Sequence, residues 1–236
     1  MMRNYYKITN ELECHHGMRC QTGMNIYPFP FKCEPDKRGG IYFAREHILE
    51  FAARGRWLRV VAVPPGAQVV EDHHHHPSRQ WRADKLILGP RKRLTKALLA
   101  KLIAEGATLR ERAVLNAIRV SDFRMVRWLV ELGAPISDLS PDAAIMAQAV
   151  TLGCDFRLVR WLVKRGAPIS EWCVVDAIKA DEPGLARWLV KHGGPASPRV
   201  LLEAIKARQA KLTRWLMERG VHLNDDVLRQ LIDDEE

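Results

Sequence analysis

One short phrase recurs four times in the C-terminal part of the chain, and each copy carries a tryptophan. The copies read MVRWLVELGAPIS, LVRWLVKRGAPIS, LARWLVKHGGPAS and LTRWLMERGVHLN, and their tryptophans are separated by 33, 27 and 27 residues. A further copy, LLAKLIAEGATLR, lies one step upstream. Self-similarity at this period is typical of stacked supersecondary units, which bury their apolar faces only against one another. The pattern therefore predicts a protein that presents a surface, not one that builds a deep catalytic pocket.

Each repeat predicts two helices. In the second helix, Met125, Trp128 and Leu129 fall at the spacing of one buried helical face. Gly133 is expected to end that helix in the left-handed conformation, and Pro135 cannot continue it. We expect the four repeated tryptophans to be core residues; they are Trp128, Trp161, Trp188 and Trp215.

An arginine precedes each of these tryptophans and is predicted to lie off the buried face. The four arginines are Arg127, Arg160, Arg187 and Arg214. They recur as a line of positive charge, which is either a solvated face or part of a binding surface.

The phrases VRWLVELGAPIS and VRWLVKRGAPIS resemble the second helix and exit of the ankyrin repeat, V-x-x-L-L-x-x-G-A-x-x-x. The first helices lack the T-P-L-H-x-A signature of that repeat, and units of 27 residues have no room for a full β-hairpin finger. The resemblance implies that residues 94–236 form an all-α, ankyrin-like repeat solenoid of about four to five degenerate units.

Residues 1–93 show no period and carry several strand-like segments. These are YYKITNE, GGIYFA, WLRVVAVP, AQVVED and WRADKLILG, each rich in β-branched or aromatic residues and bounded by turn residues. HILEFAARG, between two of them, is typical of a short helix. The sequence therefore predicts a small α+β domain over residues 1–93, followed by the repeats.

This front part also resembles a domain at the front of ankyrin-repeat proteins of giant DNA viruses of amoebae. The resemblance rests on YYKITNELECHHG, GMNIYPFPF, CEPDKRGGIYF, GRWLRVVAVP and WRADKLILGPRKRL, which occur in the order of the family's motifs. It implies a viral ankyrin-repeat protein, and the family supplies no catalytic residues to transfer.

An enzymatic alternative comes from a second resemblance. His16-Gly17 and the segment GIYFA are similar to two NAD-holding signatures of ADP-ribosyltransferases. There His16 would hold the ribose, Tyr42 would stack on nicotinamide, and Glu71 is the nearest candidate for the catalytic carboxylate. Met18 stands where that class has serine or threonine. We therefore favour a front domain without catalytic residues or a cofactor.

Metal-ligating residue types also occur in the front part. Cys14, His15, His16, Cys20 and Cys33 do not have a standard zinc spacing, so free or buried thiols are the favoured reading. The tract His73–His76 is expected to form a loop between strands. No metal site is predicted.

Charge, hydropathy and cysteine content bear on three further possibilities: nucleic-acid binding, membrane insertion and secretion. Residues 1–93 carry 16 Lys and Arg against 9 Asp and Glu, whereas residues 94–236 carry 21 against 19. No nucleic-acid motif accompanies this basic excess. We expect no membrane span, because no apolar run is long enough to cross a bilayer, and no secretory signal, because the first residues have no apolar core. Five cysteines without regular spacing predict a reducing compartment, such as the cytoplasm of a host cell.

Together these features predict a non-enzymatic protein that binds a protein partner, without a nucleic acid, a small molecule or a membrane. The repeat exits are the predicted contact surface. Its residues are Pro135, Ile136, Ser137, Asp138, Pro168, Ile169, Ser170, Glu171, Pro195, Ser197, His222 and Asn224.

Overall fold

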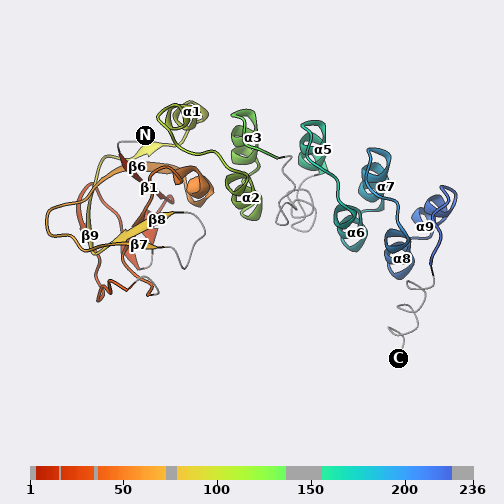
Figure 1. Ribbon diagram of the computed structural model, residues 1–236, viewed down its shortest axis with the longest axis horizontal. Helices are drawn as coiled ribbons and strands as arrows, with labels where there is room; N and C mark the ends of the chain where they lie inside the picture. The colour runs from red at the N-terminus through yellow and green to blue at the C-terminus, as the bar shows by residue number, and fades with distance from the viewer. Residues whose placement is uncertain (1–3, 16, 35–36, 73–78, 137–155, 225–236) are drawn as a thin grey trace. The chain divides into compact units, whose positions relative to one another are not determined.

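The computed structural model describes residues 4–15, 17–34, 37–72, 79–136 and 156–224 (Figure 1). The contacts divide the chain into two compact units, Met1–Pro135 and Ile136–Glu236. Each unit is described by itself.

The first unit begins with short strands and ends with helices. Its strands are β1 (Tyr5–Thr9), β2 (Cys14–His15), β3 (Met18–Arg19), β4 (Gly23–Ile26), β5 (Ile41–Phe43), β6 (Trp57–Ala62), β7 (Val69–Asp72), β8 (Gln80–Ala83), β9 (Lys85–Leu88) and β10 (Lys92–Arg93). Its helices are the 3-10 helix η1 (Ile48–Arg54) and the α-helices α1 (Lys96–Ala104), α2 (Glu111–Arg119) and α3 (Phe123–Glu131).

The strands form antiparallel sheets. One sheet has the order β1-β6-β9-β4, with β10 also paired to β6, and a second has the order β5-β8-β7. A bridge between Tyr6 and Ala44 connects β1 to the end of β5. Apolar side chains from both sheets, including Phe43, Val61 and Leu86, form one buried cluster. The predicted α+β character of the front part is confirmed.

The segment WRADKLILG is divided between the two sheets, although a single strand was expected there. Asp84 separates β8 from β9. Its carboxylate accepts a hydrogen bond from the Gln68 amide at 2.8 Å, and its carbonyl accepts one from the Tyr27 amide at 2.7 Å. These bonds turn the chain, so β8 and β9 can join different neighbours.

Several polar residues of the motif segments hold the fold together. Arg59 on β6 forms a bidentate ion pair with Glu13, in which Nη2 donates to Oε2 at 2.7 Å and Nε donates to Oε1 at 2.9 Å. Glu13 also accepts a hydrogen bond from Thr9 at 3.0 Å and has a left-handed φ of 54°. Because Arg59 is buried, this pair fastens the turn after β1 to the sheet.

Arg82 on β8 has a similar role for the loop before β5. Its side chain is fully buried and donates to the carbonyls of Lys32, Glu34 and Gly39, while its guanidinium lies over the Phe31 ring. Arg82 therefore holds the loop that precedes β5 in one conformation, through its hydrogen bonds to backbone carbonyls of that loop.

The first helices pack directly on this α+β region. Asn116 of α2 donates to the Glu50 carbonyl of η1 at 2.9 Å, and the Thr108 amide donates to the Glu46 carbonyl at 2.7 Å. Just before α1, the buried Leu94 donates its amide to the Arg56 carbonyl at 2.7 Å. The chain after residue 93 is thus joined to η1 and to the segments on either side of it.

The second unit contains α5 (Phe156–Lys164), α6 (Glu171–Lys179), α7 (Pro183–Lys191), α8 (Pro198–Lys206) and α9 (Ala210–Met217). Glycines with left-handed φ follow the second helix of each repeat, as predicted; they are Gly166, Gly193 and Gly220, and Gly133 has the same role after α3. Left-handed Asp181 and Arg208 make the tight turns that join the two helices of a repeat.

The predicted fold class is wrong for the C-terminal part. The described helices of residues 94–236 do not define a single solenoid: α1 to α3 group with the sheets, whereas α5 to α9 form the other unit. The physical reason is that α2 packs against η1 and donates a hydrogen bond to its Glu50 carbonyl. The first helices are therefore stabilised by the α+β region as well as by neighbouring repeats. The division of the chain into separable parts at residue 93 stays a prediction.

Candidate functional site

The predicted contact loops are only partly free surface. Pro168, Ile169, Ser170 and Glu171 lead into α6, and Ser197 leads into α8. Ser197 caps α8 by accepting from the Val200 amide at 3.2 Å, and its hydroxyl also donates to the Glu171 carboxylate.

The other predicted loop residues differ in exposure. Ile136 is buried and Pro135 is half-buried, whereas Pro195, His222 and Asn224 are exposed. Ser137 and Asp138 lie outside the described residues. That these loops form a contact surface stays a prediction. The Ser197 hydroxyl already makes hydrogen bonds within the protein, with the Val200 amide and the Glu171 carboxylate.

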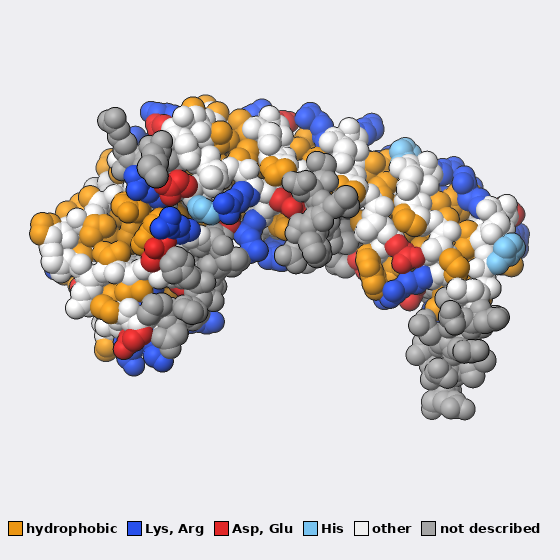
Figure 2. All heavy atoms as spheres, viewed as in Figure 1, with side chains coloured by type: hydrophobic (Ala, Val, Ile, Leu, Met, Phe, Trp, Pro, Cys, Tyr) orange, Lys and Arg blue, Asp and Glu red, His pale blue; other side chains and the backbone are white. Residues whose placement is uncertain are grey.

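The second helices of the second unit carry a strongly basic surface. Within their bounds, α5, α7 and α9 contain no Asp or Glu. Seven exposed cations lie on them, and we call these the basic row: Arg157, Arg160, Lys164, Arg187, Lys191, Lys211 and Arg214. Figure 2 shows Lys and Arg side chains along these helices. Acidic residues are found instead on the first helices, at Glu171, Asp176 and Glu203.

Two arginines of the basic row stack on tryptophans of the following repeat. The Arg160 guanidinium lies 5.3 Å from the centroid of the Trp188 ring, and that of Arg187 lies 5.0 Å from Trp215. The aromatic faces hold these cations in place while leaving them at the surface. Trp215 is buried, but Trp128, Trp161 and Trp188 are half-buried, so the tryptophans line the edge of the core.

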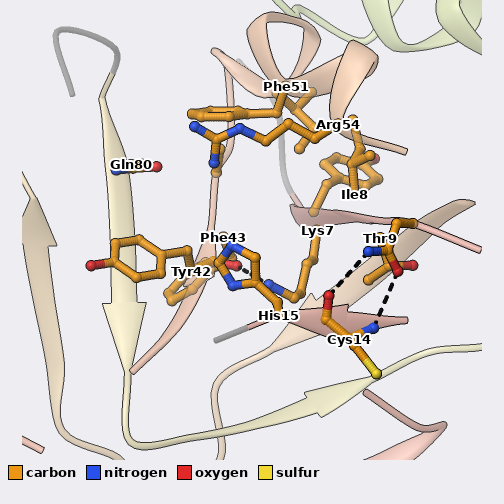
Figure 3. A pocket seen from close by; sticks show the side chains of 14 residues that line it. Lys7, Ile8, Thr9, Cys14, His15, Tyr42, Phe43, Phe51, Arg54 and Gln80 are labelled. Atoms are coloured by element: carbon orange, nitrogen blue, oxygen red, sulfur yellow. Dashed lines mark hydrogen bonds between the residues drawn. The ribbon is translucent and has the colours of Figure 1, made fainter. Parts of the chain in front are cut away.

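A pocket lies in the first unit between β1, β5 and η1. Figure 3 shows Phe51 and Arg54 on one side of it and Tyr42, His15 and Lys7 on the other. Its cavity volume is ≈ 60 Å³. The described residues that line it include no Asp or Glu.

Lys7 is the most unusual group in this pocket. Only 4% of the residue is exposed, and its ammonium donates one hydrogen bond, to the Tyr42 carbonyl at 2.9 Å. The pKa of the Lys7 ammonium is lowered to about 8, mainly because burial disfavours its charged form. The Cys20 thiol opposes this shift, and the nearby Arg54 guanidinium contributes to it.

The residues of the enzymatic alternative do not gather in this pocket. Tyr42 lines it, but Glu71 forms an ion pair with Arg79 beside β7 and β8 and is not among the lining residues. His16 lies outside the described residues. Among the described residues that line this pocket with Tyr42, none is an Asp or a Glu.

The cysteines considered as zinc ligands differ in environment. Cys14 and Cys33 are exposed free thiols, whereas Cys20 is buried. Within the described ranges, no three His, Cys, Asp or Glu side chains are grouped to hold a metal ion. His16 and His73–His76 are outside those ranges. In the same part of the chain, no helix is long and apolar enough to cross a membrane.

Comparison with known proteins agrees with the sequence resemblance. No protein-family profile matches the chain. The chain is similar to a "Putative ankyrin repeat protein" of Acanthamoeba polyphaga mimivirus, with 29% identity over 136 residues, which cover 54% of this chain and 66% of the relative. It is also similar to an "Uncharacterized protein" of the same virus, with 39% identity over 70 residues, or 27% of this chain and 49% of that relative.

The chain thus spans just under two thirds of the first relative and about half of the second. The predicted resemblance to giant-virus ankyrin-repeat proteins is confirmed.

Sequence reasoning missed Lys7. In YYKIT, lysine alternates with Tyr6 and Ile8, so the strand pattern places it on a face with Tyr5 and Thr9 and gives no sign of burial. The burial of Lys7 depends on tertiary contacts that the local sequence pattern does not contain, because the residues around it come from β5 and from β2.

Proposed function

We propose that the protein is a non-enzymatic interaction protein whose basic row binds an acidic surface of a protein partner. The observation that carries the proposal is the segregation of charge in the second unit, where seven exposed cations occupy three helices that have no carboxylate. Complementary charge speeds association and rejects partners of the wrong sign. The similarity to an ankyrin repeat protein supports a protein as the partner.

The stacked arginines suit this role. A guanidinium that lies over an aromatic ring can still donate at its edge, in the planar geometry that matches a carboxylate. Because Trp188 and Trp215 restrict Arg160 and Arg187, less side-chain entropy is lost on binding.

The viral origin of the relatives also bears on where the protein acts. We infer that the protein acts in the reducing cytoplasm of an infected host cell, on a host or a viral protein. The four described cysteines are free thiols, which is in keeping with that compartment.

Affinity capture from infected amoebae tests the proposal. One bait carries Lys164→Glu and Lys191→Glu, at equivalent positions of α5 and α7. Its matched control carries Lys179→Glu and Lys206→Glu, at equivalent positions of α6 and α8, with the same change of net charge. We expect the wild-type bait and the control bait to capture one or more proteins that the Lys164→Glu, Lys191→Glu bait does not capture. This difference should persist when the lysate is treated with nuclease.

Equal retention by both charge-reversed baits would overturn the proposal. So would capture that disappears on nuclease treatment, because the ligand of the basic row would then be a nucleic acid.

A further inference from the structure

Among the described residues, the pocket of the first unit holds a buried cation and is lined by no carboxylate. The ammonium of Lys7 has three hydrogen-bond donors, and within the described residues only the Tyr42 carbonyl accepts one of them. Burial of an ammonium is costly unless it is paired. The described lining residues add Arg54 and His15 but no carboxylate that could pair with it.

Arg54 strengthens the positive potential. It lies on the opposite wall, with its guanidinium 4.7 Å from the centroid of the Phe51 ring, and it has no ion-pair partner among the described residues. Figure 3 shows Arg54 and Lys7 on the two sides of the same opening. Two cations that face one space repel each other, and an anion between them would relieve that repulsion.

Apolar side chains form much of the remaining wall of the pocket. Phe43, Ile48 and Phe51 line it together with the Tyr42 ring. The cavity volume of ≈ 60 Å³ holds about four water molecules, which is enough for a carboxylate or phosphate group. Larger parts of a ligand would contact the apolar lining residues, among them Phe51.

We propose that this pocket binds a small organic anion, with its carboxylate or phosphate at Lys7 and Arg54 and its apolar body against Phe51. The carboxylate and phosphate classes share the chemistry that the pocket recognises, and the test separates them. This site is independent of the basic row, which lies on the other unit.

The effect of the anion on Lys7 follows from linkage. A bound anion favours the charged ammonium, so binding raises the pKa of Lys7 from about 8 toward its ordinary value of 10.5. Binding should therefore weaken as pH rises above 8. The groups that act on the pKa of Lys7 are the Cys20 thiol and the Arg54 guanidinium, and the titratable side chains of His15 and Tyr42 line the same pocket.

Calorimetric titration of the full chain with benzoate, phenyl phosphate and the neutral benzamide tests the proposal. We expect at least one of the two anions to bind at least about tenfold more tightly than benzamide. A preference between benzoate and phenyl phosphate identifies the anionic group. Lys7→Met should weaken that binding at least about tenfold, whereas Lys85→Met, which removes a half-buried lysine of β9 outside the pocket, should not.

Lys7→Met is expected to fold, because it removes a buried charge and keeps the apolar length of the side chain. Arg54→Gln, at an exposed position, provides a second variant and should weaken anion binding as well. Failure of both anions to bind, equal binding of benzamide, or unchanged anion binding by both variants would overturn the proposal.

Discussion

The Arg187 guanidinium lies 5.0 Å from the centroid of the Trp215 ring, although the two residues belong to successive repeats. Arg160 and Trp188 have the same relationship one repeat earlier, at 5.3 Å. The R-W pair that recurs in the sequence therefore links neighbouring repeats: its arginine stacks on the tryptophan of the next copy. One residue pair thus contributes both to packing and to the basic surface.

Replacement of Arg187 should loosen this link. Arg187→Gln removes one of two cations over the Trp215 ring, because the Arg219 guanidinium also lies 4.4 Å from its centroid. The substitution should lower the free energy of unfolding by roughly 0.5–1 kcal/mol, the range for exposed cation–π contacts. Lys191→Gln, at another exposed position of the same helix, is the control and should change stability less. Urea unfolding measures both variants, and equal effects would show that the Arg187 contact with Trp215 does not stabilise the unit.

The tryptophans should differ in their contribution to stability. Trp215 is 9% exposed, and Trp215→Ala should cost roughly 3–5 kcal/mol, as expected for a large core side chain. Trp161 is half-buried, so Trp161→Ala should cost less. Thermal unfolding compares them. A larger loss for Trp161→Ala would mean that the burial in the structure does not govern the energetics of these positions.

Much of the helical part could be predicted from the repeat phrase. Its apolar spacing predicts the second helices, and Gly133, Gly166, Gly193 and Gly220 end them with left-handed φ, as expected. The grouping of the helices could not be predicted. It depends on contacts such as Asn116 with the Glu50 carbonyl, between segments 66 residues apart, and local periodicity contains no information about them.

The candidate sites show the same limit. Three arginines of the basic row, Arg160, Arg187 and Arg214, were expected off the buried face from the repeated R-W pair. Arg157 and the lysines of the row were not singled out. The stacking of Arg187 on Trp215 and the burial of Lys7 depend on which elements become neighbours. Both features arise from tertiary packing, which places a polar group against a partner distant in sequence.

The buried Lys7 should make stability depend on pH. The pKa of its ammonium is about 8 in the folded chain and has an ordinary value of 10.5, so between these pH values the unfolded chain binds more protons. The free energy of unfolding should therefore rise with pH across this window, by about 3 kcal/mol at most. Lys7→Met should lack this rise when urea unfolding is measured at pH 7, 8.5 and 10. Parallel pH curves for wild type and variant would contradict the prediction.

The Glu13–Arg59 pair should be essential for the fold of the front region. Glu13→Gln leaves the buried Arg59 without its anion and should cost roughly 3 kcal/mol. Glu11→Gln, at an exposed carboxylate nearby, should cost about 1 kcal/mol or less.

The same pair should also confer acid sensitivity. The Arg59 guanidinium lowers the pKa of the Glu13 carboxyl, so its stabilisation is complete above the unfolded pKa and is lost as pH falls through the folded pKa. Acid titration of wild type and Glu13→Gln checks this, since only the wild type should lose that contribution. Acid sensitivity that survives in Glu13→Gln would assign it to other groups.

The proposed role of the basic row is tested most directly by the affinity of a captured protein partner. Its Kd is measured for the wild type, for Lys164→Glu with Lys191→Glu, and for Lys179→Glu with Lys206→Glu, at low and at physiological salt. We predict that the pair on α5 and α7 weakens binding at least about tenfold and removes most of the salt dependence, while the pair on α6 and α8 leaves both near wild type. Equal affinities of the two variants would contradict a partner-binding role for the basic row.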